Sequence, residues 1–297
     1  MKTILILHNP KAGDEDHQKK ELIDSIKLKG YQYQYASVQK DDWKKIDGDI
    51  DIILVVGGDG TVRKVVKFLL QRTLLDKKML ISLLPMGTAN NIALTLGLSY
   101  NLANLLKQWD VNKTRKMDVG AVRGSHFKNF FLESLGYGIL PKLMRTMEEI
   151  ETSHLKRSED EITFALHTLL GLSSTYKAKH AIIKVDGKQY EGNFLLIEVM
   201  NICSLGPNLI LAPNADIADG MFDIVLLREE QRQDFISYIG NVLTSKTKKV
   251  PWQSIQGKQI EIQWDGSWVH IDDELVRLDK SNSTQIEARP NILELLI

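Results

Sequence analysis

The sequence has one cysteine, carries no net charge and lacks a long apolar run. Cys203 has no partner for an internal disulfide, so the composition fits a reducing compartment and predicts a cytoplasmic protein. The 38 basic and 38 acidic residues cancel, so no overall field attracts nucleic acid. A membrane-spanning helix needs about 20 consecutive apolar residues, and the sequence has no such stretch.

Signatures of several other protein classes are also missing. There is no internal repeat or low-complexity segment, and the seven histidines show no metal-ligand spacing. Neither a Gly-x-x-x-x-Gly-Lys-Ser/Thr phosphate loop nor a Gly-x-Ser-x-Gly nucleophile turn occurs. With 43 % hydrophobic and 26 % charged residues, the 297-residue chain is typical of a globular protein, and it is long enough for two domains.

Short apolar runs alternate with helical patterns over residues 1–116. Such alternation predicts an α/β domain whose parallel sheet carries helices on both faces, and ligands of such sheets bind at the carboxyl ends of the strands. The expected elements are strands at 3–9, 31–38, 51–58 and 80–85 and helices over 17–28, from Thr61 onward and over 91–97.

The pattern changes to closely spaced strands over residues 117–297. Helical pieces interrupt them near 141–170 and 229–243, and a polar linker is expected near 112–118. The pattern predicts an all-β, antiparallel, sandwich-like domain, and whether the last strand stays in it or returns to the first domain is open. The expected strands lie at 117–123, 126–134, 178–185, 188–192, 193–201, 222–228, 258–264, 267–271, 284–288 and 291–297.

The strongest motif is Gly57-Gly58-Asp59-Gly60-Thr61, which follows a buried strand and opens a helix. Glycines let backbone N–H groups approach an anion, and the helix N-terminus adds its positive dipole. Asp59 suits a phosphate site only if it meets a metal ion or holds the loop. The alternative is a tight strand–helix turn with Thr61 as the N-cap.

Two further loops follow strands of the same predicted sheet. One is His8–Gly13, in which Lys11 is a candidate phosphate partner, and the other is Leu84–Asn91. Each alone is an ordinary turn. Because the carboxyl ends of parallel strands share one edge of a sheet, the three loops are expected to converge on one cleft.

Two acidic clusters mark the second half. Asp216 and Asp219 are three residues apart in a turn and could share a hard cation with backbone carbonyls. Asp272-Asp273-Glu274 follows a strand, and a carboxylate fixed there could accept the proton of an attacking hydroxyl. A solvated turn and a plain acidic hairpin are the respective alternatives.

Taken together, these motifs resemble the catalytic domain of the diacylglycerol kinase family, in its bacterial soluble lipid-kinase branch. GGDGT alone is shared with NAD kinases, but its combination with Leu-Pro-x-Gly-Thr-x-Asn and Asp-Gly-x-x-Asp is specific to the lipid kinases. The resemblance covers nearly the whole chain, through Asn9–Gly13, Gly57–Thr61, LPMGTANN at 84–91, ESLGYG at 133–138, APNADIADGMFD at 212–223 and the acidic turn at 272–274.

The resemblance implies an NAD-kinase-like α/β domain, a β-sandwich domain, and ATP in the cleft between them. Asp216, Asp219 and the carbonyl of Met221 would hold a structural Mg²⁺. Glu274 would be the proton acceptor, with Asp272 beside it, and Asp59 completes the candidate catalytic set. Residues that would line the nucleotide are Asn9, Pro10, Lys11, Ala12, Gly13, Ser37, Gly57, Gly58, Asp59, Gly60, Thr61, Val62, Arg63, Thr88 and Asn90.

The chain departs from the family pattern at four places. Val62-Arg63-Lys64 follows GGDGT where the family has x-Asn-Glu, and cations there oppose the helix dipole unless they serve a bound phosphate. Asn91 and Ala218 stand where Asp is common. Asp273 replaces the Gly of an Asp-Gly-Glu turn.

These observations predict an ATP-dependent lipid kinase that acts on a diacylglycerol-like hydroxyl and touches the membrane peripherally and transiently from the water side. The alternatives are an NAD-kinase-like small-molecule kinase and a non-catalytic regulator that binds lipid or nucleotide. No nucleic-acid partner is expected. The sequence leaves the acceptor lipid open, and also the oligomeric state, for which a homodimer is one option.

Overall fold

A computed structural model describes residues 2–10, 15–40, 42–44, 49–71, 79–124, 126–150, 158–244, 249–279 and 283–297. The chain divides into two compact units. Unit 1 comprises Met1–Met117 together with Ile292–Ile297, and unit 2 comprises Asp118–Asn291. The C-terminal segment, which the sequence could not assign, therefore belongs to unit 1. No helix within the described ranges is both long and apolar enough to span a membrane.

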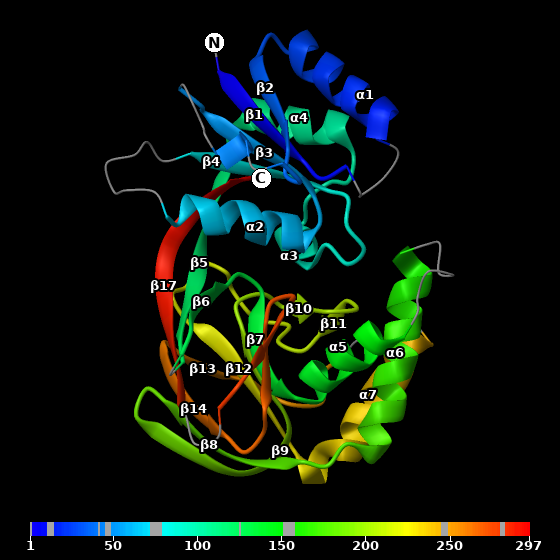
Figure 1. Cartoon of the computed structure of the whole chain (residues 1–297), viewed down its shortest axis with the longest axis vertical. Helices are drawn as coiled ribbons and strands as arrows, with labels where there is room; N and C mark the ends of the chain where they lie inside the picture. The colour runs from blue at the N-terminus through cyan, green and yellow to red at the C-terminus, as the bar shows by residue number, and fades with distance from the viewer. Residues whose placement is uncertain are drawn as a thin grey trace. The chain divides into compact units, whose positions relative to one another are not determined.

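Unit 1 is built on a parallel sheet in the order β2-β1-β3-β4 (Figure 1). The strands are β1 (Thr3–His8), β2 (Gln32–Ser37), β3 (Ile52–Gly57) and β4 (Leu80–Pro85). The end of β17 (Ser283–Leu296) adds a further parallel neighbour to β4 through Leu295 and Ile81. Every residue of β3 is buried, as expected for a central strand covered on both faces.

Helices cover both faces of this sheet. One core cluster joins β1 and β3 to α1 (Glu15–Leu28) and α4 (Leu102–Val111), and the buried Trp109 indole donates to Ser82 Oγ at 2.8 Å. On β3 packs α2 (Asp59–Leu69), which buries Val62, Val65 and Val66. Two short helices, the one-turn η1 (Asp42–Lys44) and α3 (Asn91–Leu96), also lie in the described part of unit 1.

The strand order has a functional consequence. From β1 the chain moves outward to β2 on one side, whereas β3 and β4 lie on the other side. This reversal is the topological switch point at which open α/β sheets bind their ligands, outside the carboxyl ends of the strands. His8 ends β1 and Gly57 ends β3, so two of the three predicted loops leave the sheet at this point.

Unit 2 is an antiparallel β structure with the strand order β16-β15-β7-β9-β8-β14-β17. Strand β12 pairs with β9 and β13, while β6 pairs with β5, which begins in unit 1. The bounds are β5 (Thr114–Arg123), β6 (Lys128–Phe131), β7 (Ser134–Gly138), β8 (Lys179–Val185), β9 (Lys188–Met200), β10 (Ser204–Leu205), β11 (Leu209–Ile210), β12 (Phe222–Arg228), β13 (Ile255–Gly257), β14 (Gln259–Trp264), β15 (Trp268–Ile271) and β16 (Glu274–Arg277).

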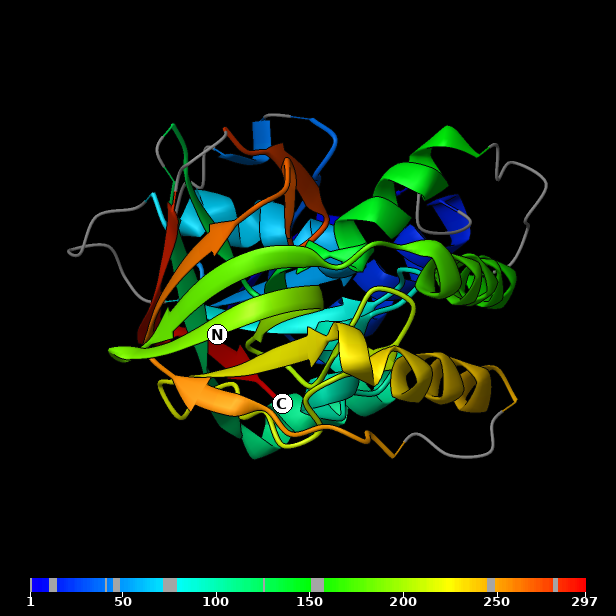
Figure 2. The ribbon, with the colours of Figure 1, turned by 90° about the horizontal axis from the view of Figure 1, so that it is seen from below.

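Two hydrophobic clusters hold unit 2 together. The first fills the interior of the β structure, with Phe131, Tyr137, Phe194 and Phe222 all fully buried. The second joins the opposite face of β9 and β12 to α5 (Ile139–Glu149), α6 (Ser158–Thr175) and α7 (Arg232–Leu243). Figure 2 shows α6 and α7 lying alongside each other. The predicted fold class, an α/β domain followed by an antiparallel sandwich-like domain, is confirmed.

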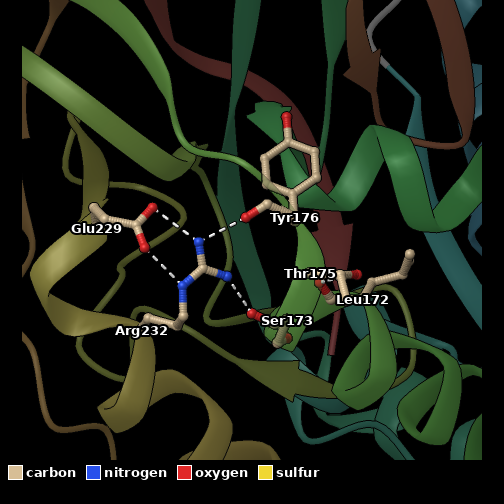
Figure 3. Close-up of polar contacts among 6 residues, drawn as sticks. All are labelled: Leu172, Ser173, Thr175, Tyr176, Glu229 and Arg232. Carbon is tan, nitrogen blue, oxygen red and sulfur yellow. Dashed lines mark hydrogen bonds and ion pairs between the residues drawn. The ribbon is translucent and has the colours of Figure 1, made fainter.

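Arg232 fastens α7 to the end of α6 (Figure 3). Its guanidinium donates to the carbonyls of Ser173 and Tyr176. It also forms a bidentate salt bridge with the Glu229 carboxylate, with distances of 2.7 and 2.8 Å. The hydrogen bond and charge of Arg232 lower the pKa of the Glu229 carboxyl. The last carbonyls of a helix have no partner within it. This guanidinium satisfies one of them, the Ser173 carbonyl, together with the Tyr176 carbonyl just after α6.

Several predicted boundaries differ from the structure. The expected strands 188–192 and 193–201 form the single strand β9, and 284–288 and 291–297 form β17. The expected linker lies largely in β5, where Thr114 and Lys116 bond Glu294 at 3.0 and 2.9 Å. Polar residues look like a linker in the sequence, but here they lie on a strand whose partner supplies their hydrogen bonds.

Two helices of unit 1 also differ from the prediction. Helix α2 begins at Asp59 with Gly58 as N-cap, so Thr61 lies inside the helix and the alternative of a Thr61 N-cap is wrong. Helix α4, which the sequence analysis did not predict, is capped by Asn101 through the amides of Ala103 and Asn104. The physical signal for α4 was present, because Asn is among the most favoured N-cap residues.

Candidate active site

The loop after β1 contacts the end of β3 and the first turn of α2. The backbone N–H of Asn9 donates to the Val56 carbonyl at 2.9 Å, and its side-chain amide donates to Thr61 Oγ1 at 3.2 Å. Ser37 lies at the end of β2 directly opposite His8, and its hydroxyl accepts from the Gln39 amide at 3.3 Å. The predicted residues Asn9, Ser37 and Thr61 are therefore brought to one edge of unit 1. Lys11, Ala12 and Gly13 lie outside the described residues, and Pro10 borders them.

The two glycine-containing loops pack backbone against backbone. A Cβ atom added to Gly58 would lie 2.8 Å from the Cα of Gly87, and one added to Gly87 would collide with the Cα of Gly58. The Met86 amide also donates to the Gly57 carbonyl at 3.0 Å. Any side chain at either glycine would push the loops apart, so this arrangement requires glycine at both positions.

Asp59 and Asn90 fix the conformation of these loops. The Asp59 carboxylate accepts the amides of Asn91 and Ile92 at 2.8 and 3.2 Å, at the start of α3. Asn90 has a left-handed backbone, with φ of 52°, and its side chain bonds the N–H and carbonyl of Gly87 at 2.8 and 2.7 Å. Asparagine tolerates this backbone region better than most residues. Asp59 thus holds the β4–α3 loop, one of the two roles that its position suggested.

The first turn of α2 explains part of the departure from the family pattern. Its N-cap, Gly58, has no side chain to bond the first amides of the helix, which suits the binding of an anion at this terminus. Val62 is 5 % and Arg63 4 % exposed, whereas Gly60 and Thr88 are exposed. Lys64 donates to the Val38 carbonyl, just past β2. The second cation therefore has a defined role in holding the end of β2.

Tyr100 belongs to this site, although the sequence analysis did not single it out. Its phenol bonds the Asn90 side chain and lies near the Asp59 carboxylate. Partial burial and the Asp59 charge raise the pKa of Tyr100, while the Asn90 hydrogen bond opposes the shift. The only signal in the sequence was an aromatic residue shortly after the Leu84–Asn91 loop.

In unit 2, the loop with Asp216 and Asp219 is organised around a buried acid. Each of the two exposed carboxylates accepts an amide of its own turn, from Ala218 at 3.0 Å and from Met221 at 2.9 Å. The fully buried Asp118 carboxylate accepts the amide of Gly220 at 2.6 Å and that of Asn291 at 2.7 Å.

The pKa of Asp118 is raised. Burial is the main cause, and the charges of Asp219 and Asp216 add to it, against the two amide hydrogen bonds. An acid with a raised pKa in the folded protein contributes stability at low pH, and this is lost as the pH rises above its ordinary value of 3.8. A cation near the three carboxylates would offset that loss. Sequence reasoning missed Asp118, although an acid within the apolar stretch of a strand was a usable signal.

Asp272 is held from several sides at the turn between β15 and β16. Its buried carboxylate accepts the amides of Leu132, Glu133 and Ser134 at 2.8–3.2 Å, and its backbone has a φ of 52°. The following residue, Asp273, does not have a positive φ. The backbone at position 273 therefore does not require the glycine that the family has there.

Glu274 begins β16 immediately after this turn. Its Oε2 accepts the side-chain amide of Asn129 at 3.0 Å, and the residue is partly exposed. The structure therefore brings Asp272 and Glu274 together but gives them different environments. Asp272 is embedded among amides, whereas Glu274 is reachable from solvent, as a group that exchanges a proton with a substrate must be.

A buried asparagine connects the two acidic regions of unit 2. The Asn201 side-chain amide donates to the carbonyls of Asp118 at 2.9 Å and Leu132 at 2.8 Å. Within the described part of the chain, no three His, Cys, Asp or Glu side chains are grouped so that they could hold a metal ion together. A cation at this loop would therefore need main-chain carbonyls and water among its ligands, as Mg²⁺ commonly has.

Known proteins match the chain over both units. Residues 3–122 match the family described as "Diacylglycerol kinase catalytic domain", and residues 145–297 match the "YegS C-terminal NAD kinase beta sandwich-like domain". A relative named diacylglycerol kinase from Bacillus subtilis is 29 % identical over 247 residues, which cover 80 % of this chain and 77 % of the relative.

More distant relatives and solved structures agree. A protein from Pseudomonas aeruginosa named "Probable lipid kinase YegS-like" is 24 % identical over 89 % of this chain and 87 % of its own length. The fold resembles a crystal structure of a diacylglycerol kinase from Bacillus anthracis with a TM-score of 0.73 at 23 % identity, covering 99 % of this chain and 96 % of the other. The predicted resemblance is confirmed, and the chain belongs to the family that has a diacylglycerol kinase catalytic domain and a YegS-type C-terminal domain.

Proposed function

We propose that this protein is a lipid kinase that transfers the γ-phosphoryl group of ATP to a hydroxyl group of a diacylglycerol-like lipid. The observation that carries the proposal is the packing of Gly58 on Gly87 at the carboxyl ends of β3 and β4, beside the switch point of the sheet. Close backbone packing of this kind, at the start of a helix, creates a surface of main-chain donors that suits phosphate. The names of the relatives, diacylglycerol kinase and lipid kinase, support a lipid as the acceptor.

In this proposal the nucleotide phosphates bind over the three loops of unit 1. Asn9 and Thr61 would present polar side chains from neighbouring loops, since their side chains already bond each other at 3.2 Å. Asp59, committed to two amides of α3, would position the loops and would not contact the transferred group. Thr88 and Gly60 are exposed and are available to the nucleotide.

Glu274 would accept the proton of the lipid hydroxyl. The carboxylate of Asp272 already accepts three backbone amides, and a group so engaged is poorly placed to exchange a proton. Glu274 accepts the side-chain amide of Asn129 and is partly exposed, so its carboxylate can be reached from solvent. We therefore assign proton acceptance to Glu274 and the stabilisation of its turn to Asp272.

We further propose that Asp216, Asp219 and the Met221 carbonyl bind Mg²⁺. Oxygen ligands from two carboxylates and a carbonyl fit this hard cation, which keeps several of its waters. The surroundings of Asp118 support the assignment, because the charges of Asp219 and Asp216 add to burial in raising its pKa, so three carboxyl groups gather at this loop. When bound, the ion would supply positive charge that neutralises these acids and stiffens the loop.

Magnesium is therefore expected to stabilise the protein, and Asp219→Asn should remove most of the effect. At a concentration about 100 times the dissociation constant, binding to the folded state alone adds about 2.7 kcal/mol, equivalent to a rise of several degrees in the melting temperature. Thermal unfolding with and without MgCl₂ measures it. Asp265→Asn, which removes an exposed acid elsewhere in unit 2, should keep the full shift. Equal shifts in both variants would contradict the site.

A direct assay tests the proposed function. The full-length protein is incubated with a total lipid extract and γ-labelled ATP, and the labelled product is identified by mass. A phosphorylated lipid is expected. A parallel incubation with NAD addresses the second candidate, a small-molecule kinase, which the family description of the C-terminal domain as NAD kinase-like favours. If ATP binds but no lipid in the extract is labelled, a non-catalytic regulator becomes the better description.

A further inference from the structure

A buried histidine–glutamate pair lies directly beneath the acidic turn. His270 of β15, Gly136 of β7 and Glu198 of β9 are register partners across three adjacent strands, so they lie in one row on the same face of the sheet. Gly136, between them, has no side chain, and a Cβ atom there would collide with the Glu198 carboxylate. The gap lets His270 Nε2 approach Glu198 Oε1 to 2.9 Å.

The His270–Glu198 pair is buried in apolar surroundings, where a charged side chain is unfavourable. The side chains of His270 and Glu198 are 4 % and 0 % exposed. Leu196 and Met200 flank Glu198 on the same face of β9, within the apolar cluster that α5 covers. Burying a charged pair in such surroundings costs more than a well-packed apolar pair of the same size. Packing alone therefore gives no reason for these two residues.

Both ring nitrogens of His270 face oxygen acceptors. Nδ1 is 3.0 Å from the Asp272 carbonyl, and Nε2 faces the Glu198 carboxylate. A carbonyl oxygen can only accept, so Nδ1 carries a proton directed at Asp272. Burial alone lowers the pKa of His270, but the Glu198 charge and the contacts with Asp272 outweigh burial and raise it above its ordinary value of 6.5. Glu198 thus holds the imidazole in the orientation in which Nδ1–H meets the turn.

The turn is therefore held through both the backbone carbonyl and the side-chain carboxylate of Asp272. The Asp272 carbonyl accepts His270, and the Asp272 carboxylate accepts the amides of residues 132–134. Two residues later, Glu274 is bonded to Asn129 of β6. A left-handed backbone at Asp272 is uncommon for a non-glycine residue, and these contacts hold it in place.

We infer that His270 and Glu198 are positioning residues that set the conformation of the Asp272–Glu274 turn, and hence the placement of Glu274, through the His270 Nδ1–H to Asp272 carbonyl bond. The inference rests on the proposed role of Glu274. Neither residue would touch substrate, and Gly136 is required in the ESLGYG motif because it leaves room for the contact. Hydrogen-bonded partners of this kind orient the groups that do the chemistry.

Two double variants test this inference against a purely structural role. Both replace Glu198→Met and so remove the buried acid. One adds His270→Leu, which has no donor, and the other adds His270→Asn, whose side-chain amide can reach the position of Nδ1. We expect the two to have similar melting temperatures and an unchanged KM for ATP. The Leu variant should lose about 10–100-fold in kcat, while the Asn variant stays close to the wild type.

Met200→Leu, in the same apolar cluster, controls for repacking and should behave as the wild type. Equal kcat values in the two double variants would overturn the inference. A second readout does not depend on kinase activity: hydrogen exchange at the amides of Leu132, Glu133 and Ser134, which the Asp272 carboxylate protects, should speed up only in the Leu variant. Unchanged exchange in the Leu variant would refute the positioning role even if no lipid were phosphorylated. If exchange is faster in the Leu variant but the wild-type protein phosphorylates no lipid, the result counts against the proposed function alone.

Discussion

Replacing Glu274 with glutamine is expected to lower the kcat of lipid phosphorylation by about 10²–10⁴-fold, the usual contribution of a general base. The amide cannot accept the hydroxyl proton, but its oxygen can still accept the Asn129 hydrogen bond. The turn should therefore keep its shape, with the KM for ATP and the melting temperature unchanged. Initial rates over a range of ATP and lipid concentrations, together with thermal unfolding, measure the three quantities.

Substitutions of the two neighbouring acids test whether the loss of kcat is specific to Glu274. Asp273→Asn removes a charge from an exposed residue of the same turn and should leave kcat within a few-fold of the wild type. Asp272→Asn replaces a carboxylate that accepts amides of three consecutive residues, so it should lower the melting temperature as well as kcat. Wild-type turnover in the Glu274→Gln protein would show that another group accepts the proton.

The second large effect is expected from Gly87→Ala. The added methyl group would collide with the Cα of Gly58, and neither backbone can yield without moving its loop. Overpacking of this kind typically costs about 1–3 kcal/mol. If the loops must be forced back together to hold the phosphates, ATP should bind about 5–150-fold more weakly. Isothermal titration calorimetry with a non-hydrolysable ATP analogue, in the presence of Mg²⁺, measures the affinity for the nucleotide.

Gly171→Ala is the matched control for this substitution. Gly171 lies in α6, and no atom approaches the position of an added Cβ within 4 Å. Alanine should there raise helix stability by about 0.5–1 kcal/mol and leave ATP affinity unchanged. If Gly87→Ala binds ATP as tightly as Gly171→Ala, the two glycine loops do not form the phosphate site.

In unit 1, the local hydrophobic pattern predicted most strands but not every helix. The apolar runs at 3–9, 51–58 and 80–85 correspond to β1, β3 and β4 with small shifts, because a short run that is apolar at nearly every position is typical of a parallel strand covered on both faces. Helix α4 escaped notice, since an amphipathic segment of ten residues without a motif resembles many loops. The N-cap of α2 is Gly58 and not Thr61, because β3 ends at Gly57 and the helix begins directly afterwards at Asp59.

For the acidic residues of unit 2, the sequence did not predict which carboxylate has which surroundings. Asp272 and Glu274 are nearly adjacent in the chain and both are carboxylic acids. Asp272 is buried among amides of residues 132–134, whereas Glu274 is partly exposed and accepts the side-chain amide of Asn129. Nothing in the sequence around them distinguishes the two. Asp118 likewise acquires its role from residues about 100 and 173 positions away, through Gly220 and Asn291.

The alternation of strands and helices, the change to antiparallel strands near residue 117 and the three glycine-containing loops could be predicted from the sequence, because they depend on residues close together in the chain. The folded chain was needed to see that Gly58 meets Gly87, that Asp59 accepts the first amides of α3, and that His270 and Glu198 face each other across Gly136. Hydrophobic period and turn chemistry are local properties, whereas the partner of a polar side chain is set by strand order and register, which bring together residues that the sequence keeps far apart.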